Sequence, residues 1–366
     1  MNAGVTITAA HIDAPRIDLK QNPLYEAEEL ALMKTHYYGG IKKYQWTAIP
    51  LELRGVVALK SGEVISVSIG ADENDPVFTI TDLLPHLSKD QMKKTMLEGI
   101  AGEALNILVG SMPLQGEEKD AAKCQVLQLL NERYGICEED FFSAELCVVP
   151  AFPARELGLD RSMIGAYGQD DRVCAYAALR GLLDSEPPRR TAICVLADKE
   201  EVGSDGVSGM KSDCFEWFVE GLCTSLGGDL RTCFANSLCL SADVVVAFDP
   251  TYPEVLDKQN AARLNYGIAV CKYAGSRGKS GTSDASAELV ARIRRIFDEA
   301  GVQWQTGELG KVDQGGGGTV AVYMAKRNID TIDAGVPVLS MHSPFEAVAK
   351  FDVYMTYRAC RAIYQA

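Results

Sequence analysis

The sequence predicts an α/β fold, with a mostly parallel central sheet flanked by helices and a second, β-rich domain inserted into it. Beyond about residue 160, short apolar runs of the kind buried on both faces of a parallel sheet alternate with loops and helical stretches. Before that point, β-branched runs joined by turn residues are typical of antiparallel sheet. We expect one domain over residues 1–20 and 156–366, and an inserted domain over residues 21–155.

The chain is expected to begin with a short strand at residues 5–10, directly before the motif His11-Ile-Asp-Ala-Pro. Because this strand precedes the β-rich segment, we assign residues 1–20 to the same domain as the later half of the chain. Residues 22–38 are expected to form a helix, since Pro23 lies in a first-turn position and two glycines follow the stretch.

The inserted segment contains a hairpin signal and one helix signal. Residues 56–59 and 64–69 are β-branched runs joined by a Ser-Gly turn, which predicts two antiparallel strands. Residues 117–134 carry apolar side chains at helical spacing and stop at Gly135, which predicts a helix.

The later half supplies the parallel sheet. Its predicted strands are the short apolar runs at residues 191–197, 244–248 and 336–341. The helical stretches between them include residues 287–300, where the apolar side chains share one face.

Composition excludes several classes of protein. The 366 residues are 47% hydrophobic and 23% charged, which is typical of a well-cored globular chain and excludes disordered and fibrous proteins. A net charge of −14 argues against nucleic-acid and anionic-lipid partners. The 11 cysteines form no C-x-x-C pair, so we expect reduced thiols. We see no signal peptide and no apolar run long enough to cross a membrane, so we expect a cytoplasmic protein.

Acidic residues and histidines gather where predicted strands end, and open α/β sheets bind ligands at the carboxyl ends of their strands. Two of the four histidines of the chain fall in these clusters. The clusters are His11 with Asp13, Asp170 with Asp171, Glu200 with Glu201, Asp243, and His342.

These residue types supply what metal-assisted hydrolysis of an amide requires. Two cations need imidazole and carboxylate ligands, one of them bridging, and a further carboxylate accepts the proton of the attacking water. Asp13, two positions after His11, is expected to hold the second ring nitrogen of that histidine. Of the adjacent Glu200 and Glu201, one is expected to bind metal while the other acts as general base.

The order of the motifs is also informative. They are His11-Ile-Asp-Ala-Pro, Gln169-Asp-Asp-Arg, Asp198-Lys-Glu-Glu-Val-Gly-Ser, Ser241-Ala-Asp and Met341-His-Ser-Pro. In this order they resemble the aspartyl aminopeptidase and aminopeptidase I family of dinuclear zinc exopeptidases, most closely its bacterial branch, over nearly the whole chain. The resemblance implies a zinc-exopeptidase-like catalytic domain and an inserted domain for oligomerisation or regulation.

Carried over residue by residue, the resemblance implies a pair of bound divalent ions. Zinc is the expected metal, and cobalt or manganese could replace it. It implies that His11 and Asp243 are ligands of opposite ions and that Asp170 bridges the two. The remaining ligands are then Glu201 and His342.

The resemblance further implies that Glu200 is the general base, with Asp13 in support. It implies a tetrahedral homododecamer, in which His86 of one subunit reaches the active site of a neighbour. Family members usually carry a longer stretch ahead of the H-x-D motif than the ten residues present here, which makes a truncated start one interpretation. Asp249 stands where eukaryotic relatives have histidine, and its effect stays open.

Simpler interpretations stay open for several of these residues. Asp243 could cap a helix, Asp171 could pair with Arg172 or cap the following helix, and Asp13 could form a turn. Glu200 and Glu201 could be a solvated pair. His11 and His342 could occupy core positions, and His86 could lie on the surface.

Two glycine-rich loops also stand out. The run at residues 315–318 fits no phosphate-binding motif, so we expect it to permit close backbone approach to a bound peptide or to the wall of the metal site. In the loop at residues 275–281, Arg277 and Lys279 either face substrate or lie in a solvated loop.

Taken together, these features predict a metal-dependent aminopeptidase that acts on peptides with a free N-terminus. The alternatives are an N-acyl amino acid amidohydrolase or a carboxypeptidase with the same dinuclear site, and an inactive, truncated assembly subunit. No residue pattern predicts which N-terminal amino acid is preferred.

Overall fold

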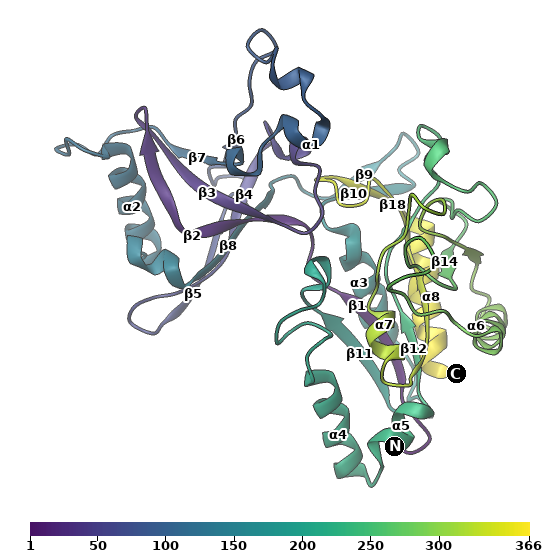
Figure 1. The fold of residues 1–366 in the computed structure, drawn as a ribbon. Coiled ribbons are helices and arrows are strands. Elements are labelled where there is room, and N and C mark those ends of the chain that lie inside the picture. The colour runs from purple at the N-terminus through teal and green to yellow at the C-terminus, as the bar shows by residue number, and fades with distance from the viewer. The chain divides into compact units, whose positions relative to one another are not determined.

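The computed structural model describes residues 1–366 and shows a mixed α/β fold with several sheets, as predicted (Figure 1). The chain forms two compact units. The first comprises Met1–Ala14, Ala154–Met341 and Phe345–Ala366, and the second comprises Pro15–Pro153 and His342–Pro344. No helix in either unit combines the length and the apolar character that crossing a bilayer requires.

The first unit is built on a six-stranded sheet. In order across the sheet, the strands are β11 (Ala192–Ala197), β1 (Thr6–His11), β12 (Leu238–Ser241), β16 (Asp330–Gly335), β14 (Ile268–Cys271) and β15 (Trp304–Thr306). The first four run parallel, β14 runs antiparallel to β16, and β15 pairs parallel with β14. The carboxyl ends of β11, β1 and β12 therefore lie together at one edge.

Helices cover both faces of this sheet. One core cluster joins the sheet to α3 (Gln169–Leu183), α6 (Ala287–Glu299) and α8 (Lys350–Gln365), and another joins it to α4 (Cys214–Leu226), α5 (Leu230–Ala235) and α7 (Ala321–Ala325). In β1, Ile7 and Ala9 pack into the second cluster, whereas Thr8 between them points to the opposite face and contacts Tyr364 of α8. β1 is therefore buried from both sides.

A second sheet of five strands belongs to the same unit. In order, its strands are β13 (Val245–Val246), β17 (Pro337–Leu339), β18 (Glu346–Ala349), β10 (Met163–Ala166) and β9 (Arg155–Leu157). β13 pairs parallel with β17, and the other pairs are antiparallel. The chain passes from β10 through a short turn into α3, so this sheet positions the beginning of that helix.

The apolar runs expected as central strands at residues 244–248 and 336–341 belong to this second sheet. The central sheet takes β12 and β16, which directly precede them. β12 reads Leu-Cys-Leu-Ser and lacks β-branched residues, so its sequence carries a weak strand signal. The strands predicted at residues 5–10 and 191–197 and the helix predicted at residues 287–300 are confirmed as β1, β11 and α6.

The second unit contains an antiparallel sheet of seven strands, together with α1 (Met96–Gly99) and α2 (Ala121–Tyr134). The predicted hairpin is confirmed as β4 paired with β5, and the predicted second-unit helix is confirmed as α2, which begins at Ala121. In order, the strands are β5 (Val64–Ile69), β4 (Leu51–Ala58), β8 (Ala144–Pro150), β2 (Arg16–Ala27), β3 (Leu30–Tyr38), β7 (Ile107–Gly110) and β6 (Thr79–Ile80).

The helix expected at residues 22–38 is wrong. This stretch forms most of β2 and all of β3, which pair antiparallel around a tight turn of two glutamates with positive φ. In β3, the buried Ala31, Met33 and Thr35 alternate with more exposed residues, which is the period-two pattern of a strand. The proline and glycines that bound the stretch mark the ends of strands as well as of helices, so they did not discriminate between the two.

Candidate metal centre

Three parallel strands bring polar side chains to one edge of the central sheet. His11 is the last residue of β1 and is paired with Ala197, the last residue of β11. β11 leads into the 3₁₀ turn η5 (Glu200–Val202), and β12 ends shortly before Asp243. Since β1 lies between β11 and β12, residues from three separate stretches of the chain converge at this edge.

The imidazole of His11 lies at the centre of the cluster and is 1% exposed. Its Nδ1 lies 3.0 Å from the carbonyl oxygen of Asp13 and 3.3 Å from Oδ1 of the same residue, so Nδ1 carries a proton and donates it to Asp13. Nε2 faces two acids, at 3.2 Å from Asp170 Oδ1 and 3.9 Å from Asp243 Oδ1. A histidine held at Nδ1 in this way can offer Nε2 to a cation.

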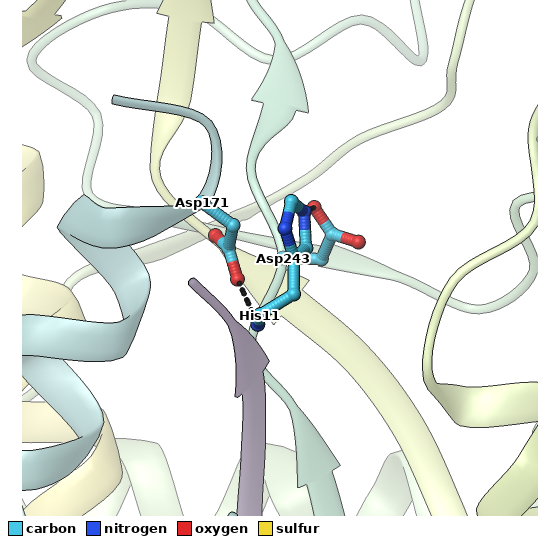
Figure 2. Close-up of side chains that lie close together, drawn as sticks. All are labelled: His11, Asp171 and Asp243. Carbon is cyan, nitrogen blue, oxygen red and sulfur yellow. Dashed lines mark hydrogen bonds and ion pairs between the residues drawn. The ribbon is translucent and has the colours of Figure 1, made fainter. Parts of the chain in front are cut away.

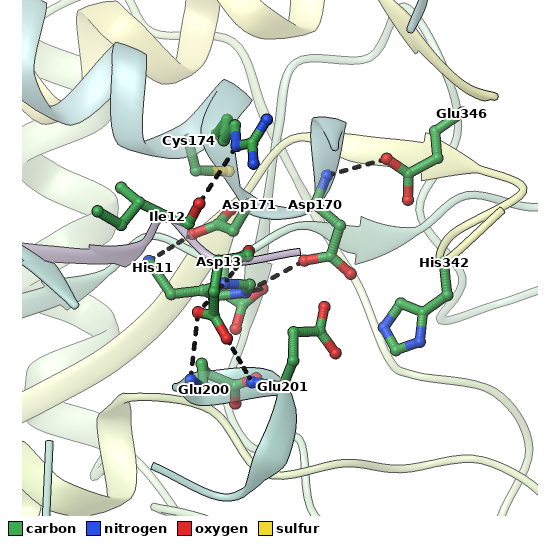
Figure 3. A network of polar contacts seen from close by, with 12 residues as sticks. His11, Ile12, Asp13, Asp170, Asp171, Cys174, Glu200, Glu201, His342 and Glu346 are labelled. Carbon is green, nitrogen blue, oxygen red and sulfur yellow. Dashed lines mark hydrogen bonds and ion pairs between the residues drawn. The ribbon is translucent and has the colours of Figure 1, made fainter. Parts of the chain in front are cut away.

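Asp170 and Asp171 lie in the first turn of α3 and point in different directions. Asp170 faces Nε2 of His11, whereas Oδ2 of Asp171 accepts the backbone N–H of His11 at 3.1 Å (Figure 3). The backbone departs from helical geometry at both residues, which lets these neighbours diverge. Arg172, expected as an ion-pair partner of Asp171, donates from Nε to the carbonyl oxygen of Ile12 at 3.2 Å.

Two groups of three residues have ligand atoms close enough to hold a cation. In each group these atoms lie within 4.8 Å of one another, and Figure 2 shows the one that contains Asp243. The groups are His11, Asp170 and Glu201, and His11, Asp171 and Asp243. The structure thus brings together four of the five residues that the sequence marks as metal ligands, and it adds Asp171.

The carboxylate of Asp13 has a second set of contacts. Its Oδ1 accepts the backbone N–H of Glu200 and its Oδ2 that of Glu201, each at 3.2 Å. One buried carboxylate therefore holds the His11 ring and the main chain of both glutamates. From the turn fixed in this way, the Glu201 side chain extends toward Asp170 (Figure 3).

The cluster contains more negative than positive groups. Burial raises the pKa of Asp171 well above its usual value, an effect that His11 opposes and Asp170 reinforces. Burial likewise raises the pKa of Asp243, and the charge of Asp171 adds to it. Burial opposes protonation of His11, but hydrogen bonds to Asp13 and Asp170 raise its pKa well above the usual value. Divalent cations would offset the repulsion among these carboxylates, so these residues fit a metal centre.

Two of the predicted site histidines belong to the second unit. His342 lies with its Nδ1 2.8 Å from the carbonyl oxygen of Gly40, which makes Nε2 the nitrogen suited to a cation. His86 lies in an exposed segment between β6 and α1. Their roles, as a metal ligand and as an active-site residue of a neighbouring subunit, stay predictions.

The glycine run at residues 315–318 permits close backbone approach, and the segments that approach are loops of the same unit. A Cβ at Gly315 would lie 1.8 Å from the carbonyl oxygen of Leu309, and a Cβ at Gly316 would lie 2.4 Å from Cα of Ser276. The loops at residues 275–281 and 309–318 therefore pack backbone against backbone.

Two further residues that the sequence singled out are held by their neighbours. Oδ1 of Asp249 accepts the backbone N–H of Thr251 at 2.8 Å, a local turn contact. Nζ of Lys279 donates to Asp284 at 2.9 Å, within the loop.

Glu346 contacts the cluster and was not singled out by the sequence. It is 1% exposed, and its Oε2 accepts the backbone N–H of Asp170 at 3.2 Å (Figure 3). Its place four positions after His342, next to a recognised motif, was the available signal.

Comparisons with known proteins agree with the motifs. The sequence profile of the family described as aminopeptidase I zinc metalloprotease (M18) matches residues 1–364. A probable M18 family aminopeptidase 1 of Clostridium acetobutylicum is 53% identical over 359 residues, which span 96% of this chain and 77% of that protein. A protein of the same description from Thermotoga maritima is 50% identical over 368 residues, spanning 99% of this chain and 81% of its own length.

Solved structures share the fold. The crystal structure of an M18 family aminopeptidase from Thermotoga maritima matches with a TM-score of 0.97 at 50% identity, covering 100% of this chain and 81% of its own. The S. cerevisiae mApe1 dodecamer matches with a TM-score of 0.76 at 23% identity, covering 99% of this chain and 79% of its own. The profile match and the identities near 50% confirm the predicted family: this chain belongs to the M18 aminopeptidase I family of zinc metalloproteases and is a hydrolase.

Proposed function

We propose that this M18 aminopeptidase removes the N-terminal residue of peptides with a pair of divalent cations held at the edge of its central sheet. The observation that carries the proposal is the convergence of one imidazole and several buried carboxylates on one spot. Buried carboxylates are costly without a counter-charge, and imidazole with carboxylate is a ligand set that zinc takes in hydrolases. Zinc is the proposed metal, with cobalt or manganese able to replace it.

The distances support an assignment of ligands that differs in one point from the sequence expectation. His11 and Asp243 were expected on opposite ions, but their facing atoms, Nε2 and Oδ1, are 3.9 Å apart, which is close enough for one ion between them to bind both. We therefore assign them to the same ion. Asp170 is the proposed bridge and Glu201 a ligand of the other ion, and the family resemblance alone supports His342 as its further ligand.

Bound divalent cations supply Lewis acidity, which polarises the scissile carbonyl and lowers the pKa of a water molecule. Glu200 takes the proton from the attacking water and passes it to the leaving amine. Asp13 keeps Glu200 in place, because it holds the backbone of Glu200 and Glu201 together. Both glutamates lie in a 3₁₀ turn, and because such a turn has about three residues per turn, adjacent side chains leave it in different directions. One glutamate can therefore bind metal while the other handles the proton.

We further propose a homo-oligomer that assembles through the segment following β6 in the second unit. Six large apolar side chains in this segment are half exposed or more, and exposed apolar groups this dense mark an interaction surface. They are Leu83, Leu84, Leu87, Met92, Met96 and Leu97. The same segment carries His86, which in a tetrahedral dodecamer would reach the site of a neighbour and stabilise the carbonyl oxygen during attack. The S. cerevisiae mApe1 structure is a dodecamer.

A cytoplasmic location is proposed as well. All 11 cysteines are free, as expected for a protein of a reducing compartment.

The experiment that tests the function compares free and blocked peptides. The chain is treated with a chelator and then assayed with zinc, cobalt or manganese on a panel of peptides and on their N-acetylated counterparts. We expect cleavage of the free peptides only after metal is restored, and little cleavage of the blocked ones. Faster cleavage of the blocked peptides, or a rate that chelation leaves unchanged, would contradict the proposal.

A further inference from the structure

We propose that Glu346 is a positioning residue that fixes Asp170, the bridging carboxylate of the proposed metal site, through its backbone. This inference rests on the proposed function. Glu346 is the first residue of β18, the middle strand of the five-stranded sheet, and is paired with Ala166 at the end of β10. Because the chain turns from β10 into α3 at Gly168, Glu346 stands beside the turn that carries Asp170.

The contact itself is buried and direct. Oε2 of Glu346 accepts the backbone N–H of Asp170 at 3.2 Å, and the two residues are 1% and 3% exposed. In the same turn, Nε2 of Gln169 donates to the carbonyl oxygen of Ile164 at 3.2 Å. Residues of this turn are thus tied to the five-stranded sheet, and the tie at Asp170 is made by Glu346.

The tie belongs to a pattern that covers this edge of the central sheet. Four of the proposed ligands and base have a backbone N–H that points at a buried carboxylate. The pairs are His11 with Asp171, Asp170 with Glu346, and Glu200 and Glu201 with Asp13. These hydrogen bonds fix the main chain from which the ligands project.

The position of Glu346 matters because Asp170 is the ligand that both cations would share. A shift of the Asp170 main chain moves its carboxylate relative to His11 Nε2, which lies 3.2 Å away. Outer partners that orient metal ligands typically change metal affinity about 10- to 100-fold when removed. A residue that acts in this way affects metal binding more than it affects folding.

Two substitutions separate the hydrogen bond from the charge. Glu346→Asp keeps the charge but shortens the side chain, so the carboxylate no longer reaches the N–H of Asp170. Glu346→Gln keeps the length and one acceptor oxygen but removes the charge. The wild-type chain and both variants are treated with chelator and titrated with Co²⁺, whose visible absorption reports the geometry of its ligands. Thermal unfolding in chelator measures folding without metal.

We expect Glu346→Asp to bind Co²⁺ about 10- to 100-fold more weakly, with an altered absorption spectrum and a lower kcat at little-changed KM. We expect Glu346→Gln to bind Co²⁺ with nearly wild-type affinity and absorption spectrum. We also expect all three chains to unfold at similar temperatures in chelator.

Wild-type affinity and spectrum in Glu346→Asp would overturn the proposal, even if that variant unfolds at a lower temperature, because the role would then be structural only. Equal impairment of Glu346→Gln would overturn it too, since the charge rather than the contact would matter. A wild-type chain that binds Co²⁺ but cleaves no peptide would contradict the proposed function and leave this comparison intact.

Discussion

At the scale of single residues, the carboxylate of Asp13 connects the two sides of the site. It accepts a hydrogen bond from Nδ1 of His11 on one side and hydrogen bonds from the backbone N–H groups of Glu200 and Glu201 on the other. The orientation of the metal-facing imidazole and of the two glutamates therefore depends on one buried acid, which is 4% exposed.

Substitution of the adjacent glutamates tests the division of labour between them. Glu200→Gln should lower kcat about 10²- to 10⁴-fold, because the proton acceptor is lost, while bound metal stays at the wild-type level. Glu201→Gln should lower both kcat and metal affinity, because a ligand is lost. Peptide assays and elemental analysis on the same samples make the comparison. A Glu200→Gln variant that retains its peptidase rate would rule out Glu200 as the base.

A buried acid that is not a proposed metal ligand provides a test of pH dependence. Burial raises the pKa of Asp333 on β16 to about 6, although Thr319 donates a hydrogen bond to it at 2.8 Å. Because the folded pKa exceeds the unfolded one, the contribution of Asp333 to stability is fully present below about pH 4 and is lost as the pH rises through about 6.

Asp333→Asn should remove this pH dependence. We expect the wild type to lose about 1 kcal/mol of unfolding free energy relative to the variant between pH 5 and pH 8. Urea unfolding of both chains at the same metal concentration measures the difference. A difference that does not change with pH would show that Asp333 titrates alike in the folded and unfolded states.

The site was predictable from sequence to the extent that its residues follow strands in recognisable motifs. His11, Asp170, Glu201 and Asp243 are of this kind, and the structure brings them together. The contact of Glu346 with Asp170 was not predictable, because the two are far apart in the sequence and a carboxylate that accepts a main-chain N–H leaves no spacing pattern.

At the scale of secondary-structure elements, prediction succeeded where the hydrophobic periodicity was clear. It failed where only the proline and glycine residues at the ends of a stretch were used to assign it. The hairpin β4–β5 and helix α6 have the periods of a strand and of a helix. In the β2–β3 stretch, Pro23 and the glycines after Tyr38 suggested a helix, whereas the alternation of buried residues in β3 marks a strand. The five-stranded sheet was not predicted, since its strands are only two to four residues long.

The end of β16 shows how packing between elements supports the site. A Cβ at Gly335 would lie 1.9 Å from the carbonyl oxygen of Asp243 and 3.0 Å from Sγ of Cys174. Gly335→Ala should therefore displace the backbone at Asp243, weaken metal binding and cost about 1–3 kcal/mol of stability.

Gly221 in helix α4 is the matched control, because a Cβ there meets nothing within 4 Å. Gly221→Ala should raise stability by about 0.5–1 kcal/mol and leave metal affinity unchanged. Chemical unfolding and metal titration of both variants provide the readout. Wild-type stability and metal affinity in Gly335→Ala would contradict the proposed link between β16 and Asp243.

At the scale of the whole molecule, the α/β class followed from the alternation of buried strands and helices, and the family followed from the order of the motifs. Assembly is a separate matter, because the second unit exposes apolar side chains that its own fold does not cover. The net charge of −14 makes copies of the chain repel one another, so contact between subunits needs a compensating apolar surface. The segment dense in exposed apolar side chains is a strong candidate for it.

A charge placed in that segment should prevent assembly. Leu87 is 70% exposed, and Leu87→Arg would bury a charge in the proposed subunit contact. We expect smaller particles in sedimentation and a peptidase rate about 100-fold lower, because His86 would no longer reach a neighbouring site. Leu159→Arg, at a fully exposed position of the first unit, is the control and should sediment like the wild type. Unchanged sedimentation of Leu87→Arg would place the subunit contact elsewhere.

The central claim is that His11, Asp170, Glu201 and Asp243 hold a pair of cations. Anomalous diffraction from zinc-loaded crystals, recorded on both sides of the zinc absorption edge, locates such ions directly. We predict two peaks about 3.5–4 Å apart, with Asp170 between them and His11 Nε2 bonded to one. An empty cluster in crystals that carry zinc elsewhere, or a single ion that Asp170 does not touch, would contradict the account.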